Sequence, residues 1–174
     1  MAKENQLRDY QKSILDKLES IKSADAPASA GYLGVMIGGK YVLVDLQEIT
    51  ETLPLVEILP VPLVKSWFLG VSNVRGVLYA INDLAQLLES KVTKISSSTR
   101  LLLIGGHVSA NVAFIADRLI GLRNLTNLKK RDEMLQGNIC LKPETYEDEE
   151  KNIWHVLDCD KLVHSKEFAT PYAI

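Results

Sequence analysis

The stretch Gly70-Val71-Ser72-Asn73-Val74-Arg75-Gly76 lies inside the apolar segment WFLGVSNVRGVLYAINDL, residues 67–84. Two apolar runs separated by Arg75-Gly76 predict a β-hairpin with a two-residue turn, because glycine readily adopts the positive φ that such turns need. An arginine at this tip presents a planar fork of donors and stays charged at physiological pH. From the residues alone, the tip either recognises a partner or forms an ordinary turn with a solvated Arg75.

Similar short apolar runs, bounded by turn residues, continue from Tyr32 to Asp158. Their number and length predict an all-β fold built as small barrels or a sandwich. Gly38-Gly39 predicts a second two-residue hairpin turn. Pro60 and Pro62 remove backbone donors, so their segment is expected to be an edge strand or a crossing loop.

Three segments between the strands are expected to contain short helices: residues 46–53, 84–90 and 159–165. Asp83, Asp117 and Asp158 each follow an apolar strand, a position that favours capping of a following helix. The polar residues 96–100 are expected to connect two halves of the fold. The acidic residues 144–152 are expected to form a solvated turn.

The N-terminal region has a different pattern. Leu7, Ile14, Leu18 and Ile21 form an apolar stripe within residues 3–22, which predicts an amphipathic helix. This helix could pack on its own domain or form a coiled coil with a partner. We therefore expect a helix and linker over 1–31, a main domain over 32–163 and a C-terminal tail over 164–174.

Composition excludes several function classes. The chain has 174 residues and a formal net charge of −2, without the extended basic surface that nucleic-acid binding needs. It has no apolar run of about 18 residues and no signal-peptide core, so we expect a cytoplasmic protein without membrane insertion. Two cysteines without CxxC spacing favour a reducing compartment.

No pattern in the chain predicts catalysis or a cofactor. The three histidines lack metal-ligand spacing, and neither a phosphate loop nor a GxSxG motif occurs. Two of the three aspartates Asp83, Asp117 and Asp158 could be recruited as an acid and base pair, but their positions fit capping better. We therefore expect no enzyme activity, no metal and no cofactor.

The hairpin and its surroundings resemble the CheW family, the adaptor domains of bacterial chemosensory arrays. The resemblance rests on Pro60-Val61-Pro62, Trp67, the motif Gly70–Gly76, the strand Val77–Ile81 and Asp83-Leu84. It continues in residues 41–45, VAFIADRLIGL at 112–122 and IWHVLDCDKLV at 153–163. It spans residues 32–163.

This resemblance implies two small five-stranded SH3-like β-barrels that share an apolar seam. It also implies a non-enzymatic adaptor that joins the cytoplasmic tip of a methyl-accepting chemoreceptor to the regulatory domain of a histidine kinase. The family's motif arginine matters for these contacts. The expected partner-binding residues are Val71, Asn73, Val74, Arg75 and Gly76.

Three features depart from the usual family pattern. Asn82 puts an amide into a usually apolar strand, where it either faces outward or hydrogen-bonds inward. Residues 125–137 are shorter than usual and lack the expected proline. The N-terminal helix exceeds the minimal adaptor, and with the overall pattern it makes the chain similar to adaptors of type IV pilus twitching systems.

Other functions remain open at this point. A flagellar chemotaxis coupling protein would differ only in its partners. A ring component could line an array without contacting a receptor. A small-barrel hydrolase would have to use Asp117 or Asp158, and the sequence offers no nucleophile for it.

Overall fold

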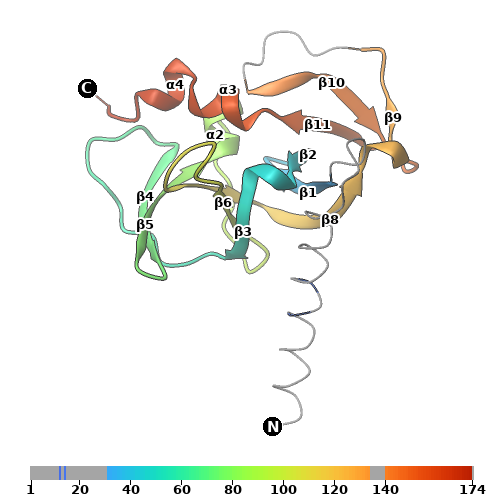
Figure 1. Ribbon diagram of the computed structural model, residues 1–174. Helices are drawn as coiled ribbons and strands as arrows, with labels where there is room; N and C mark the ends of the chain where they lie inside the picture. The colour runs from blue at the N-terminus through green and yellow to red at the C-terminus, as the bar shows by residue number, and fades with distance from the viewer. Residues whose placement is uncertain (1–11, 13, 15–30, 134–139, 174) are drawn as a thin grey trace.

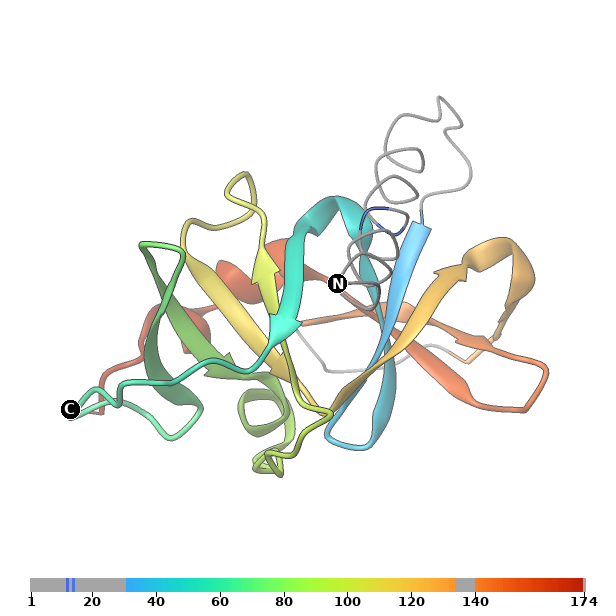
Figure 2. The same ribbon diagram turned by 90° about the horizontal axis from the view of Figure 1, so that it is seen from below.

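The computed structural model describes residues 12, 14, 31–133 and 140–173, so most of the expected helix over 3–22 lies outside the described residues. The described chain forms two sheets that lie side by side (Figures 1 and 2). The first sheet contains β1 (Gly31–Ile37), β2 (Lys40–Asp45), β8 (Arg118–Asn124), β9 (Lys129–Lys130), β10 (Leu141–Glu147) and β11 (Ile153–Leu157). The second contains β3 (Ile49–Pro54), β4 (Phe68–Val74), β5 (Val77–Asp83), β6 (Arg100–Ile104) and β7 (Val112–Ala116).

The chain enters the second sheet from β2 and returns to the first through β8. The strand orders are β8-β1-β2-β11-β10-β9 and β3-β6-β7-β5-β4. Strand β11 pairs in parallel with β2, and β5 pairs in parallel with β7. Residues 96–99 lie between α2 (Leu84–Glu89) and β6, and Arg100 is the first residue of β6, so this segment stays within the second sheet. The prediction that they connect the two halves of the fold is therefore wrong.

The core lies between the two sheets. One cluster of buried side chains combines strands of both, including Leu33 and Val35 from β1 with Leu102 from β6 and Phe114 from β7. This continuous apolar contact confirms the expected pair of small barrels that share a seam. The first sheet has six strands instead of five because the two-residue β9 pairs with β10.

Short helices follow the strands at two of the expected places. Helices α2 (Leu84–Glu89) and α3 (Cys159–Val163) begin after Asp83 and Asp158, whose side chains accept from backbone amides in the first turn. The prediction that Asp117 also caps a helix is wrong. Because β8 begins directly after it, its carboxylate instead accepts from Gly39 N at 3.1 Å.

Two other local predictions are also corrected. Only η1 (Leu46–Glu48) of residues 46–53 is helical, and the rest belongs to β3, whose β-branched residues favour a strand. Residues 144–147 belong to β10, so the acidic turn begins only at Asp148. A second short 3₁₀ helix, η2 (Leu125–Asn127), lies in the shortened segment, part of which is outside the described residues.

Asn82 faces inward. It is buried, and its Nδ2 donates to Ala80 O and Ala113 O, each at 3.1 Å. The amide thus bridges β5 to β7 inside the second sheet, which satisfies both of its donor hydrogens.

Candidate partner-binding surface

The β4–β5 turn has the geometry that its sequence predicts. Val74 pairs with Val77, while Arg75 and Gly76 between them have φ of 52° and 85°. The Asn73 side chain closes the turn by accepting from Gly76 N at 2.8 Å. Asn73 and Gly76 are therefore turn-forming residues, and both are exposed.

Arg75 projects from this turn and binds one carboxylate. Its side chain is 73% exposed, and its Nη1 and Nη2 donate to the two carboxylate oxygens of Glu51 at 2.6 and 2.5 Å. The hydrogen bonds and charge of Glu51 raise the pKa of the guanidinium, which stays protonated at physiological pH. A non-glycine residue with positive φ costs about 1–2 kcal/mol, so turn geometry alone does not favour arginine here.

The other polar and small residues of the motif support the fold. Gly70 has φ of 144°, and a Cβ there would lie 2.2 Å from Leu59 O. This close approach allows the backbone of Leu59 to exchange two hydrogen bonds with Val71. Ser72 is buried and donates from Oγ to Glu57 O at 2.5 Å. Both residues fix the crossing loop over 55–67 against β4.

The two valines predicted to contact a partner occupy different environments. Val74 is only 7% exposed and belongs to the core of the second sheet, so it cannot present its side chain to a partner. Val71 is half-buried beside Leu59. The exposed apolar residues at this hairpin are instead Val77 and Leu78, the latter 54% exposed. Sequence reasoning missed them because they belong to an apolar run that predicted a buried strand.

Glu51 connects Arg75 to an apolar groove between the sheets, which we call the seam groove. Its volume is about 340 Å³. Its lining comes from η1, β1, β3, β8 and the N-terminal segment: Ile14, Leu33, Leu46, Ile49, Thr50, Glu51, Thr52, Leu119, Gly121 and Leu122. Because these residues are dispersed along the chain, no local motif predicts the groove. Glu51 is one of the lining residues, and its ion pair with Arg75 adds charge beside an apolar surface.

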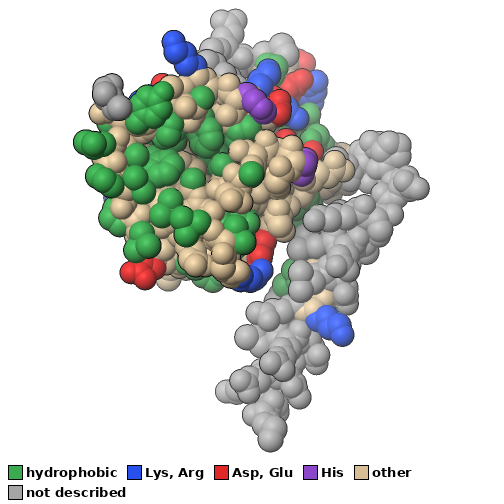
Figure 3. Space-filling view, turned by 60° about the vertical axis from the view of Figure 1, so that its left-hand side comes forward, with side chains coloured by type: hydrophobic (Ala, Val, Ile, Leu, Met, Phe, Trp, Pro, Cys, Tyr) green, Lys and Arg blue, Asp and Glu red, His purple; other side chains and the backbone are tan. Residues whose placement is uncertain are grey.

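A second apolar surface lies on the loop between β3 and β4. Leu59, Val61, Leu63 and Tyr172 expose large hydrophobic side chains, and we call this set the loop patch. Figure 3 views the side of the molecule where apolar side chains gather over this loop and the C-terminal tail. Contiguous exposed apolar surface often marks a site of protein interaction.

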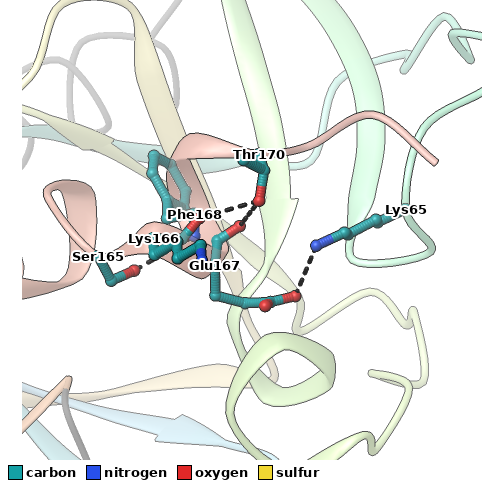
Figure 4. Close-up of polar contacts among 6 residues, drawn as sticks. All are labelled: Lys65, Ser165, Lys166, Glu167, Phe168 and Thr170. Carbon is teal, nitrogen blue, oxygen red and sulfur yellow. Dashed lines mark hydrogen bonds and ion pairs between the residues drawn. The ribbon is translucent and has the colours of Figure 1, made fainter. Parts of the chain in front are cut away.

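The C-terminal tail holds this loop in place (Figure 4). In α4 (Lys166–Ala169), Glu167 binds Lys65 Nζ at 2.9 Å, and Phe168 stacks on Trp67 with ring centroids 5.6 Å apart. Backbone bonds also join Lys65 N to Pro171 O and Ala173 N to Leu63 O. The ion pair, the ring contact and the backbone hydrogen bonds with the C-terminal tail therefore hold the loop patch in a fixed position.

The described part of the chain offers neither a metal-binding cluster nor a membrane-spanning helix. Within residues 12, 14, 31–133 and 140–173, no group of three or more His, Cys, Asp or Glu residues could hold a metal ion. In the same part of the chain, no helix is long and apolar enough to span a membrane. The candidate sites in this part of the chain are two apolar surfaces, the seam groove and the loop patch.

Comparison with known proteins places this geometry in a family. The chain is 29% identical over 100 residues to Protein PilI of Pseudomonas aeruginosa, a match that covers 58% of this chain and 56% of PilI. The match thus spans about half the length of that curated relative. The structure superimposes on the scaffolding protein TtCheW from Thermoanaerobacter tengcongensis with a TM-score of 0.66 at 12% identity, covering 80% of this chain and 95% of TtCheW. The family model of the CheW-like domain matches residues 31–167, and the chain belongs to the CheW-like family.

Proposed function

We propose that this protein is a non-enzymatic adaptor that couples a chemoreceptor to a histidine kinase in a pathway controlling type IV pilus twitching motility. The observation that carries the proposal is Arg75, an exposed guanidinium bound to Glu51, which lines an apolar groove. An apolar groove with a charged edge suits recognition of an amphipathic helix. The tip of a chemoreceptor is a helical coiled coil, so it has the surface that this groove can bind.

An adaptor needs separate surfaces for two partners. The seam groove with Arg75 supplies one, and we assign it to the receptor. The loop patch supplies the other, and we assign it to the regulatory domain of the kinase. Since the C-terminal tail fixes the loop patch through Lys65 and Glu167, little conformational entropy would be lost when a partner binds there.

The similarity to PilI supports the pilus pathway. A flagellar coupling protein would use the same surfaces for different partners, so the identity of the recovered partners decides between the two. Coupling also requires that the adaptor bind the receptor or the kinase more tightly in one signalling state. This role places the protein at the cytoplasmic tip of the receptor.

Binding measurements with purified fragments test the assignment of the groove. The protein is immobilised and exposed to a soluble receptor tip and to a kinase regulatory domain from the same bacterium. Arg75→Ala should weaken receptor binding roughly 30-fold, the loss typical of a hot-spot residue. Arg118→Ala is the matched control, because Arg118 is an exposed arginine on β8 that lines a different cavity. Equal binding by all three proteins would move the receptor site away from Arg75.

A second variant separates the two surfaces. Leu63 is highly exposed and has φ of 59°, a conformation that asparagine tolerates well. Leu63→Asn should therefore weaken kinase binding and leave receptor binding unchanged. Recovery of neither partner by the parent protein would contradict the adaptor function, and recovery of flagellar partners would contradict the pilus pathway.

A further inference from the structure

The seam groove is lined in part by a side chain from outside both sheets. Ile14 lines it together with Leu33, Ile49, Leu119 and Leu122. Ile14 precedes β1 in the chain and is helical in conformation. Part of the wall of the groove is therefore supplied by Ile14, which belongs to the protein's own N-terminal segment.

The sequence around Ile14 fits this placement. Ile14 belongs to the apolar stripe of residues 3–22, with Leu7, Leu18 and Ile21 at helical spacing. Lys12, also helical and exposed, lies two positions away, so its side chain points to a different face of a helix. The pattern thus predicts a helix with one apolar face, which includes Ile14, and one charged face.

We propose that the N-terminal segment, through Ile14, is the resident occupant of the seam groove, and that a partner helix must displace it in order to bind. The second half of this inference rests on the proposed adaptor function. The segment is covalently linked to β1, so its docking is intramolecular and benefits from a high effective concentration. A partner then binds with an affinity reduced by the fraction of molecules whose groove is occupied.

The contact is suited to displacement because it covers the groove only in part. Ile14 is 44% exposed and Leu122 on the groove edge is 45% exposed. A half-covered isoleucine contributes only part of the free energy of full burial. An amphipathic partner helix that covered the groove more fully, and also contacted Arg75, would compete with such a segment.

Chemical labelling of the full chain tests the docking without any partner. Leu122→Cys introduces a thiol at the groove edge, whose reaction rate with a maleimide reports how often the groove is open. The native Cys140 and Cys159 are buried, and burial raises the pKa of both thiols, so they should react slowly. Adding Ile14→Asp should increase the labelling rate of the introduced thiol about fivefold, whereas Lys12→Asp should leave it unchanged. The same rate with both substitutions would overturn the proposal.

Cross-linking identifies the occupant. Ile14→Cys combined with Leu122→Cys should be joined within one chain by a short bismaleimide, and much faster than Lys12→Cys combined with Leu122→Cys. A cross-linked dimer as the main product would assign the groove to a second copy and overturn the proposal.

Receptor binding then tests displacement. The Ile14→Asp protein should bind the receptor fragment about fivefold more tightly than the Lys12→Asp protein. Equal affinities would overturn displacement. If the receptor fragment bound neither protein while Ile14→Asp still increased labelling, the docking would stand and only the proposed function would fail.

Discussion

Two hairpin turns in this protein have nearly the same backbone but different surroundings. In the β1–β2 turn, Gly38 and Gly39 have φ of 58° and 81°, and in the β4–β5 turn Arg75 and Gly76 have 52° and 85°. The first turn is enclosed at its first position, since Gly38 is buried and a Cβ on it would lie 3.0 Å from the Cβ of Ala85. The second is open, with no atom within 4 Å of a Cβ placed on Gly76.

The first turn is also held by two polar side chains from distant elements. Lys91 Nζ donates to Gly38 O at 2.8 Å, and Asp117 accepts from Gly39 N. In the second turn the only comparable side-chain bond to the turn backbone within the described residues is local, from Gly76 N to Asn73. Gly38 thus meets two needs, positive φ and lack of space, whereas the exposed Gly39 meets the need for positive φ. In the second turn space is available, and an arginine is present despite its cost in backbone strain.

The largest expected effect is a loss of stability when a side chain is added to the enclosed Gly38 instead of the open Gly76. Gly38→Val adds a β-branched side chain at positive φ and forces it against Ala85, so unfolding free energy should fall by about 3 kcal/mol. Gly76→Val carries the backbone strain alone and should cost about 1–2 kcal/mol. Urea denaturation of both variants measures the difference, and equal losses would show that enclosure contributes nothing.

The next prediction separates turn geometry from recognition. Arg75→Asn places a residue that favours this backbone conformation at the tip, so the unfolding free energy should be almost unchanged. Receptor binding should still weaken roughly 30-fold, because asparagine cannot replace the guanidinium fork. Thermal unfolding and binding are measured on the same samples. Full binding by this variant would mean that the turn, and not the arginine, is recognised.

Asp117 tests the long-range support of the first turn. Asp117→Ala removes the acceptor of Gly39 N and should lower the unfolding free energy by about 1.5 kcal/mol. Asp160→Ala is a suitable control, since Asp160 is exposed in the first turn of α3. A loss no larger than that of the control would show that Asp117 does not hold the turn.

The smallest effect is expected for the local bond of the second turn. Asn73→Ala removes a neutral amide acceptor from Gly76 N and should cost about 0.5 kcal/mol, less than the loss of the charged acceptor Asp117. Chemical denaturation measures this value. A larger loss of unfolding free energy than Asp117→Ala causes would show that the local bond of Asn73 stabilises its turn more than the long-range bond of Asp117 does.

The capping aspartates show how far sequence reasoning extends and where it stops. Asp83 and Asp158 precede helices that begin at the next residue, so a local pattern predicts their role correctly. Asp117 has the same local pattern, but its partner is Gly39, which no nearby residue reveals. The hairpin valines behave similarly, since Val74 and Val77 flank the same turn and pair with each other, yet only Val74 is buried.

Neighbouring residues suffice to predict the two tight turns, most of the strands, the helices after Asp83 and Asp158, and the motif around Arg75. They do not reveal that the second barrel is inserted between β2 and β8, that Arg75 binds Glu51, or that a groove forms where η1, β1, β3 and β8 meet. The two groups of features differ in the range of their interactions. Turn geometry and capping depend on residues a few positions apart, whereas barrel closure and burial depend on contacts between residues far apart in the chain.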